Sequence, residues 1–335
     1  MPENRLTGKK ILVTGGAGFI GSNLCEHFLK DNTVVCLDDL STGFKDNIQH
    51  LLGNDKFTFI QGDICDLETC KNALKGVDMV FHQAALGSIP RSINNPIKTN
   101  EVNVGGFLNM LVASKEEGVD RFVFAASSST YGDHQGLPKV EDKIGQPLSP
   151  YAVTKYTNEL YGKVFADLYG LEVIGLRYFN VFGKNQTPDG PYAAVIPKFI
   201  AAFIEHKPPT INGDGEQSRD FTFIQNVIHA NEMAALTGHE HAKGEIYNVA
   251  YGDRCTVNEL VEILKRELCS FDEKIRSLEV TYGPERPGDV KHSLADISKA
   301  RECLGYDPQF NLNDGIKEAI QWYWNSLAPD LAKKQ

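Results

Sequence analysis

Short apolar runs alternate with longer amphipathic segments through the first half of the chain. Apolar runs suited to buried strands begin at Ile11 and recur at 33–37, 57–61, 78–82, 121–126 and 172–177. Helical patterns separate them, the first ending near residue 29 and the others covering about 67–75, 97–117 and 150–169. Strands this apolar, separated by helices, predict a parallel sheet covered on both faces. Right-handed crossovers make such a sheet doubly wound, with a ligand crevice at the carboxyl ends of its strands.

The regular alternation stops at Val181. Turn-rich segments at 183–191 and 212–215 come next, and they separate a second set of patterns. In that set, helices are predicted at about 194–206, 226–237, 256–269 and 313–326, and short strands at 221–224 and 246–249. We therefore predict a smaller C-terminal α+β substrate domain that closes over the crevice.

The turn after the first strand is rich in glycine. Gly15 permits a tight turn, Gly18 lets a pyrophosphate approach the backbone, and Gly21 allows the helix to pack closely on the strand. About 20 residues later, Asp38 is suited to accept hydrogen bonds from both ribose hydroxyls. No cation stands before Lys45 to receive a 2′-phosphate, which favours NAD over NADP. An unrelated glycine-rich turn is the alternative, but the order of strand, turn, helix, strand and acid favours a Rossmann-like dinucleotide site.

Polar and small residues follow the other predicted strands as well. Asp63 is suited to accept from an adenine amino group, and Ala84 and Ala85 leave room for a cofactor against the backbone. Each of these fits an ordinary loop when taken alone, but the strand ends meet at one edge of the sheet. Other polar and aromatic residues expected at this edge are His82, Gln83, Ser127, Ser128, Ser129, Tyr178, Phe179 and Asn180.

Length and charge narrow the class of protein. With 335 residues, of which 41% are hydrophobic, the chain can form two domains, which we predict as an NAD-binding domain (1–180 and 221–253) and a smaller domain (181–220 and 254–330). The net charge of −10 argues against nucleic acid and anionic membranes as partners, so a polyanionic ligand must be met by a few placed arginines. No apolar run approaches the ~20 residues of a membrane span and the start carries no leader pattern, so we expect a cytoplasmic protein.

No metal site is expected. The seven cysteines lie mostly in apolar contexts typical of buried thiols. Cys65 and Cys70, and likewise His239 and His241, lack nearby residues that would complete a zinc site.

A tyrosine and a lysine lie in the first turns of the helix predicted at about 150–169. Ser149 is suited to the N-cap and Pro150 to the first helical position, which sets Tyr151 in the first turn. Lys155, four residues on, shares its face. Bringing a tyrosine pKa from ~10 to ~7 requires about 4 kcal/mol, of which an ammonium ~6 Å away supplies about 3 kcal/mol at an effective dielectric of ~20. The helix N-terminus and an oxidised nicotinamide supply the rest, so we expect a base mainly when NAD⁺ is bound.

The alternative is an exposed tyrosine and lysine on a helix surface. Ser127, Ser128 and Ser129 argue against it, because they end the preceding strand at the same edge of the sheet. A serine hydroxyl there can bridge a substrate oxygen and Tyr151. The expected meeting of these serines with Tyr151 and Lys155 at one edge of the sheet favours a catalytic site.

Four motifs together match a known superfamily. They are the glycine turn 15–21, the serine triplet followed by Tyr131 and Gly132, the Tyr151 and Lys155 pair, and the segment 177–183. With these motifs the chain resembles the extended short-chain dehydrogenase/reductase superfamily, and over nearly its whole length it resembles the UDP-sugar 4-epimerases. Segments 82–92 and 125–134 are most similar to the bacterial branch that acts on UDP-N-acetylhexosamines.

The resemblance implies a mechanism and a set of site residues. Tyr151 would take the proton of the C4 hydroxyl while NAD⁺ takes the hydride, and the 4-keto sugar would turn before the hydride returns. Ser127, with Ser128 or Ser129, would hold the 4-oxygen, and Lys155 the nicotinamide ribose. The implied cofactor residues are Gly15, Gly18, Phe19, Ile20, Gly21, Asp38, Asp39, Ser41, Thr42, Gly43, Asp63, Ile64, Gln83, Ala84, Ala85, Asn103, Tyr151, Lys155 and Phe179. The implied substrate residues are Gly87, Ser88, Ser127, Ser129, Tyr151, Asn180, Ala194, Val195, Arg219, Arg286, Asp289 and Ser293.

Substrate choice and assembly follow from the same resemblance. Ser293 falls where related epimerases carry a bulky tyrosine or a small residue, and a small residue leaves volume for an N-acetyl group. We therefore expect UDP-GlcNAc and UDP-GalNAc as substrates, with UDP-Glc and UDP-Gal also possible. A UDP-hexuronic acid, elimination by a dehydratase or decarboxylase, and a non-catalytic NAD-binding protein remain alternatives. The resemblance also implies a homodimer, formed through a four-helix bundle of the helices about 97–117 and 150–169.

Overall fold

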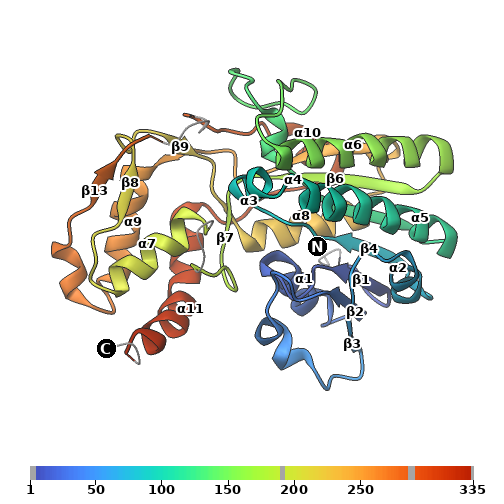
Figure 1. Ribbon diagram of the computed structural model, residues 1–335, viewed down its shortest axis with the longest axis horizontal. Helices are drawn as coiled ribbons and strands as arrows, with labels where there is room; N and C mark the ends of the chain where they lie inside the picture. The colour runs from blue at the N-terminus through green and yellow to red at the C-terminus, as the bar shows by residue number, and fades with distance from the viewer. Residues whose placement is uncertain (1–4, 189–192, 286–290, 333–335) are drawn as a thin grey trace.

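A seven-stranded parallel sheet forms the centre of the larger part of the molecule (Figure 1). The computed structural model describes residues 5–188, 193–285 and 291–332. The strands are β1 (Lys10–Thr14), β2 (Thr33–Asp38), β3 (Phe57–Gln61), β4 (Met79–His82), β5 (Arg121–Ser127), β6 (Glu172–Tyr178) and β11 (Glu245–Val249). Their order is β11-β6-β5-β4-β1-β2-β3, so the direction of winding reverses between β1 and β4. The predicted doubly wound, Rossmann-like fold is confirmed.

Helices cover both faces of this sheet. One face carries α2 (Leu67–Leu74), α5 (Phe107–Glu117) and α6 (Pro150–Tyr169), and the other carries α1 (Phe19–Phe28) and α8 (Ile224–Leu236). The alternation of side chains along β1 supplies both cores: Leu12 packs with the first group of helices, and Ile11 and Val13 pack with the second. Strands buried on both faces explain the near-continuous apolar runs of the sequence.

Local signals set the ends of α6. The Ser149 hydroxyl accepts a hydrogen bond from the Ala152 nitrogen at 3.1 Å, and Pro150 occupies the first turn. Gly170 ends the helix in the left-handed region, at φ +70°. The predicted helix is confirmed, and its start sets Tyr151 near the sheet edge.

The helix predicted at about 97–117 is interrupted. It consists of α4 (Pro96–Asn100), the π-helical turn η2 (Glu101–Gly106) and α5. A Cβ atom on Gly106 would lie 2.6 Å from the Ile64 side chain, so the turn lets the segment after β3 pack against this helix. The short helix α3 (Ile89–Asn94), which precedes α4, was not predicted.

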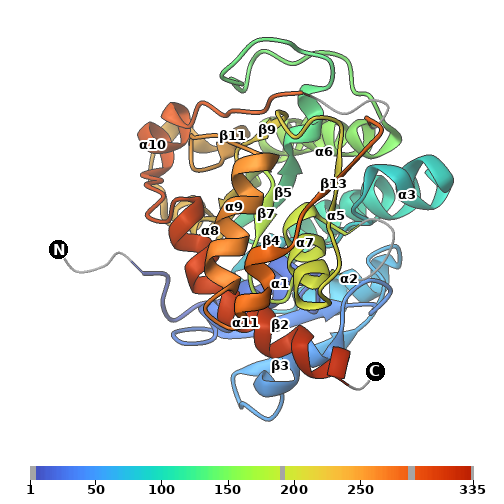
Figure 2. The same ribbon diagram turned by 90° about the vertical axis from the view of Figure 1, so that its left-hand side faces the viewer.

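The smaller part combines helices with two-stranded pairs, and Figure 2 looks onto it with the sheet behind. Its helices are α7 (Val195–Ile204), α9 (Val257–Leu268) and α11 (Leu312–Ala332), whereas α10 (Ser298–Leu304) packs against β11 and α8 of the larger part. The paired strands are β7 (Val181–Phe182) with β10 (Thr222–Phe223), β8 (Thr210–Asn212) with β13 (Thr281–Gly283), and β9 (Ser218–Arg219) with β12 (Cys255–Thr256). The 3₁₀ turns of the described residues, in both parts of the molecule, are η1 (Lys45–Leu51), η3 (Ser128–Tyr131), η4 (Glu240–Ala242) and η5 (Glu273–Ser277). Among the described residues, no helix is both long and apolar enough to cross a membrane.

Candidate active site

The glycine turn joins β1 to α1 and lies against the segment after β4. Gly15 has φ +65°, and a Cβ atom on it would lie 2.7 Å from the Ala84 nitrogen. A Cβ atom on Gly21 would lie 2.1 Å from the Gly15 oxygen. Both distances are far shorter than van der Waals contact, so only glycine fits these two positions.

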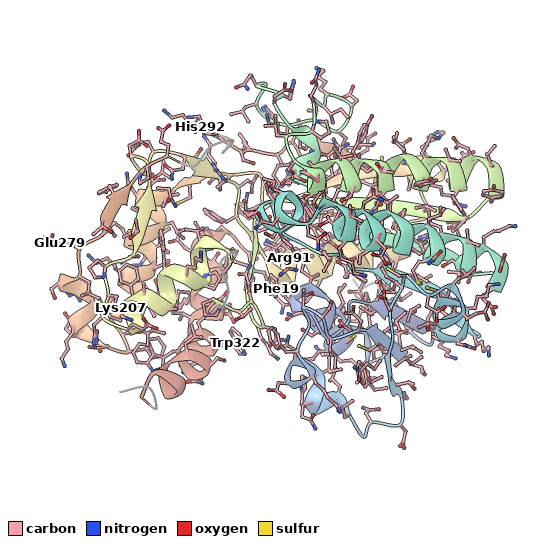
Figure 3. All side chains as sticks on the ribbon, viewed as in Figure 1. Phe19, Arg91, Lys207, Glu279, His292 and Trp322 are labelled. Atoms are coloured by element: carbon pink, nitrogen blue, oxygen red, sulfur yellow. The ribbon has the colours of Figure 1, made fainter. Side chains whose placement is uncertain are left out.

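A cavity of about 450 Å³ lies beside this turn, at the carboxyl ends of the central strands. Phe19 at the start of α1, one of its lining residues, lies in Figure 3 where the smaller part meets the sheet. The predicted cofactor residues that line the cavity are Gly15, Gly18, Phe19, Ile20, Gly21, Asp38, Asp39, Ser41, Thr42, Gly43, Asp63, Ile64, Gln83, Ala84, Ala85, Tyr151 and Lys155. The cavity lies at the switch point of the sheet, where doubly wound folds bind their ligands.

Asp38 is held in one position at the wall of this cavity. Its Oδ2 accepts from the Ala17 nitrogen at 2.9 Å and its Oδ1 from the Leu40 nitrogen at 2.8 Å. Burial raises the pKa of Asp38, and the hydrogen bonds from these amides oppose the rise. A carboxylate fixed in this way suits ribose hydroxyls and repels a 2′-phosphate.

The cavity fits a dinucleotide. The α1 N-terminus offers unpaired N–H groups to a pyrophosphate. Both polar atoms of the Gln83 side chain are buried, and neither forms a hydrogen bond of ordinary geometry with the described residues. The Tyr178 hydroxyl is nearby, and the Gln83 side chain partly opposes the rise in the pKa of Tyr178. A buried amide in that state costs about 1–3 kcal/mol, which a polar ligand would offset.

Three predicted residues lie elsewhere than expected. The Asn103 side chain is outside the cavity wall; its Oδ1 accepts from the Leu86 nitrogen at 2.7 Å and its Nδ2 donates to Thr154 Oγ1 at 3.1 Å. It therefore ties the segment after β4 to α6. Phe179 lines the neighbouring cavity described next, and Gly87, predicted for the substrate, lines the dinucleotide cavity.

A second cavity, of about 320 Å³, adjoins the first and shares Tyr151, Ser127, Ser128 and Asn180 with it. The other predicted residues that line it are Ser88, Ser129, Phe179, Arg219 and Ser293. The residues that line it and were not predicted are Ile89, Tyr131, Gly132, Lys139, Leu148, Ser149 and Ala152. No Asp or Glu among the described residues lines it.

Lys139 is the charged residue that sequence reasoning missed in this second cavity. It is 4% exposed, its ammonium donates to the His134 carbonyl, and no carboxylate of the described residues forms an ion pair with it. Burial lowers its pKa. Its backbone pairs with the Leu294 carbonyl, one residue beyond Ser293, at 2.7 Å. Hydrogen bonds with segments far along the chain bring Lys139 to the cavity, so no local motif marks it.

Tyr151 is half-buried at the junction of the two cavities, and Lys155 is buried beside it in the wall of the dinucleotide cavity. The Lys155 ammonium lies 5.9 Å from the centre of the Tyr151 ring and donates to the Ala125 carbonyl at 2.8 Å. Burial lowers the pKa of Lys155 to about 8, opposed by the charge of Glu159. Burial raises the pKa of Tyr151, opposed by the Ser127 hydroxyl. The chain alone therefore keeps the phenol protonated at neutral pH, and further positive charge is needed to make it a base.

The serine triplet forms a tight turn opposite Tyr151. The Ser129 hydroxyl donates to the Ser127 hydroxyl oxygen at 2.9 Å, and the Ser129 nitrogen donates to the same oxygen at 3.2 Å. Ser127 thus ends β5 and caps η3, which directs the triplet towards the second cavity. Ser128 lines both cavities.

A third cavity, of about 580 Å³, continues into the smaller part along α7, β8 and β9. The predicted substrate residues Asn180, Ala194, Val195 and Arg219 line it. It is also lined by Lys198, Thr210, Asn212, Gln217 and Val257, which were not predicted. Thr210 and Asn212 lie on the three-residue strand β8, which is too short to give a clear pattern. Arg286 and Asp289 lie outside the described residues. Among those residues, no cluster of His, Cys, Asp or Glu is arranged to hold a metal ion.

Comparisons with known proteins identify the family of the chain. Residues 11–250 match the model of the NAD dependent epimerase/dehydratase family. A putative UDP-glucose 4-epimerase of Methanocaldococcus jannaschii is 40% identical over 319 residues, covering 94% of this chain and 99% of that protein.

Two solved structures are also similar. The UDP-N-acetylglucosamine 4-epimerase of Methanobrevibacter ruminantium, in complex with UDP-N-acetylmuramic acid, superimposes with a TM-score of 0.88 at 39% identity, covering 96% of this chain and 100% of the other. The UDP-glucuronic acid 4-epimerase of Bacillus cereus, with UDP-glucuronic acid and NAD, has a TM-score of 0.85 at 33% identity, covering 95% and 99%. The chain belongs to the NAD dependent epimerase/dehydratase family, and NAD is its cofactor.

Proposed function

We propose that the protein is a UDP-sugar 4-epimerase that interconverts UDP-GlcNAc and UDP-GalNAc through a transient 4-keto sugar. The position of Tyr151 and Ser127 carries the proposal, because both line the dinucleotide cavity and the adjoining second cavity. A C4 hydroxyl held between them lies next to a dinucleotide, as proton and hydride removal from one carbon requires. The third cavity, with Arg219, suits the UDP group, since a guanidinium grips a diphosphate at two points.

Each residue has one task in this mechanism. Tyr151 removes the proton from the C4 hydroxyl and later returns it, while Ser127 and Ser129 hold the oxygen. NAD, when bound, supplies the hydride acceptor and a positive charge beside the phenol. Lys155, with its pKa of about 8, is mostly charged at neutral pH and offsets the cost of the phenolate by about 3 kcal/mol. Elimination needs a further acid or base near C5 and C6, and the acid-free wall of the second cavity, within the described residues, favours epimerisation.

The test is turnover of purified protein with UDP-GlcNAc, UDP-Glc and UDP-GlcNAcA. We expect the C4 epimer with unchanged mass, and a loss of at least ~10³-fold in kcat for Tyr151→Phe, which removes the acid-base group. The bound dinucleotide, measured after denaturation, controls for loss of the site. A product lighter by water or carbon dioxide, or full activity of Tyr151→Phe, would refute the proposal.

Ser293 supports the choice of the N-acetylated pair. It lines the second cavity and is small, so it leaves room beside the sugar. We expect Ser293→Tyr to lower kcat/KM for UDP-GlcNAc at least ~10-fold more than for UDP-Glc, because the added ring fills that volume. Equal losses on the two substrates would argue against this role.

A UDP-hexuronic acid is the second candidate, and Lys139 is the observation that favours it. A buried ammonium without a carboxylate partner among the described residues suits a ligand that brings its own carboxylate. We expect Lys139→Met to lower kcat/KM for UDP-GlcNAcA at least ~10-fold more than for UDP-GlcNAc if the carboxylate binds there. Equal losses of kcat/KM on the two substrates would argue against a carboxylate site at Lys139 and favour the neutral sugars as substrates.

A further inference from the structure

A buried ion pair lies behind the catalytic groups and was not among the predicted site residues. Glu159 on α6 is 5% exposed and Arg177 on β6 is 3% exposed. We propose that Glu159, fixed by Arg177, is a positioning residue that holds Lys155 and the serine turn in register with Tyr151. The inference rests on the proposed function and adds to it a residue that touches neither sugar nor dinucleotide.

Arg177 fixes the Glu159 carboxylate at two points. Its Nε donates to Oε1 at 2.8 Å and its Nη2 to Oε2 at 2.7 Å. Its Nη1 donates to the Glu141 carbonyl at 2.9 Å, and the guanidinium lies 4.7 Å from the centre of the Tyr131 ring. Burial alone would lower the pKa of Arg177, but the Glu159 carboxylate holds it above its usual range. Neither partner can rotate away without leaving a buried charge unpaired.

The same carboxylate reaches the serine turn. Thr130 Oγ1 donates to Glu159 Oε1 at 3.3 Å. Thr130 belongs to η3, the turn capped by Ser127. Glu159 therefore links the helix that carries Tyr151 to the turn that carries Ser127, and so helps to set the distance between these two groups.

Glu159 also acts on Lys155, which lies one helical turn before it on the same face of α6. Lys155 is buried, and Glu159 is the group whose charge opposes the lowering of its pKa. The other titratable groups near this ammonium are Tyr151 on α6, His82 on β4 and Tyr178 at the end of β6. Burial and the Lys155 charge lower the pKa of His82 to about 3, and burial raises the pKa of Tyr178 to about 12, so both are neutral near pH 8.

The negative charge of Glu159 favours the protonated form of Lys155. Removing the negative charge of Glu159 makes the buried ammonium less favourable, so Lys155 loses its proton at a lower pH. In Glu159→Gln, which keeps the shape of the side chain, we expect the alkaline limb of kcat/KM to move down by about one pH unit. In Glu159→Asp, which keeps the charge and shortens the reach to Thr130, we expect a lower kcat with the limb unmoved.

A second readout does not need turnover. In protein labelled with [¹³Cε]lysine and stripped of dinucleotide, the Lys155 signal, assigned with Lys155→Met, should titrate at a pH lower by the same amount in Glu159→Gln. Asp167→Asn is the matched control, because it removes a charge from an exposed part of α6. If Glu159→Gln folds poorly, the double variant with Arg177→Met removes both charges together, which is often tolerated. A smaller shift in the same direction is expected in it, because the positive charge of Arg177 is lost together with the nearer negative charge of Glu159.

The outcomes separate the two ideas. If the limb and the Lys155 titration stay in place in the Gln variants while melting temperature or kcat falls, the pair is merely structural and the inference is wrong. If the wild-type protein epimerises no UDP-sugar, the proposed function fails, and the lysine titration still tests the action of Glu159.

Discussion

At the scale of single residues, the glycine turn gives the sharpest prediction. A Cβ atom on Gly21 would lie 2.1 Å from the Gly15 oxygen. Because this oxygen belongs to the backbone, the clash cannot be relieved by the rotation of a side chain. We expect Gly21→Ala to abolish retention of NAD and to cost at least about 1–3 kcal/mol of stability. The measurements are dinucleotide content after denaturation and melting temperature. Gly105→Ala is the control, since nothing lies within 4 Å of its added Cβ; retention of NAD by Gly21→Ala would contradict the prediction.

The residues that sequence reasoning found are those with local signatures. Gly15, Gly21 and the Tyr151 and Lys155 pair have roles that depend on spacing within one turn or one helix, and the structure brings all of them to the dinucleotide cavity. Glu159 and Lys139 were missed, because their roles depend on partners far along the chain: Arg177 for the first, and the segment around Leu294 for the second.

At the scale of elements, Arg121 joins two of them. This residue begins β5, and its Nη1 donates to the carbonyls of Ala234, Ala235 and Thr237 at 3.1, 2.6 and 3.0 Å, where α8 ends. Its Nη2 donates to Glu172 Oε2 at 2.6 Å. We expect Arg121→Met to lower the free energy of unfolding by about 3 kcal/mol, because the carbonyls at the end of α8 lose this donor and Glu172 keeps only the ion pair with Lys243 among the partners described.

Chemical denaturation measures this cost. Arg121→Lys should recover only part of it, since an ammonium cannot serve all these acceptors in the planar geometry of a guanidinium. A Met variant as stable as the wild type would show that water replaces the arginine at the helix end.

Elements with long patterns were predictable and short ones were not. The strands of the sheet have long apolar runs, and the helix α6 has a serine at its N-terminus and a glycine at its C-terminus; both signals can be recognised in the sequence. The pairs β8 with β13 and β9 with β12 are two or three residues long, and only tertiary packing stabilises them. Ile64 approaches Gly106 closely at the end of the π-helical turn η2, a contact between segments that no local pattern encodes.

At the scale of the whole molecule, an uncovered apolar face runs along α6. Val153, Leu160, Val164 and Leu168 are 50%, 52%, 45% and 72% exposed, spaced as one helical stripe. We propose that a second copy of the chain covers it, as the sequence led us to expect. Light scattering should then give twice the chain mass for the wild type and the single chain mass for Leu160→Glu with Leu168→Glu, since burying two carboxylates prevents association.

Tyr282→Glu is the control for that experiment, because Tyr282 is 59% exposed and lies on β13, away from the stripe. A wild-type monomer, or an unchanged mass in the double variant, would show that a second copy does not cover this stripe.

The order of the strands has a consequence for how the protein is made. The sheet is completed by β11, which pairs with β6 although 66 residues separate Tyr178 from Glu245 in the sequence. A nascent chain leaving the ribosome therefore presents β6 as an open edge, with its unpaired N–H and C=O groups available to other chains, until Val249 has emerged. We expect the seven-stranded sheet of the larger part to be completed late in translation. Chains stopped before Glu245 should aggregate through the open edge of β6.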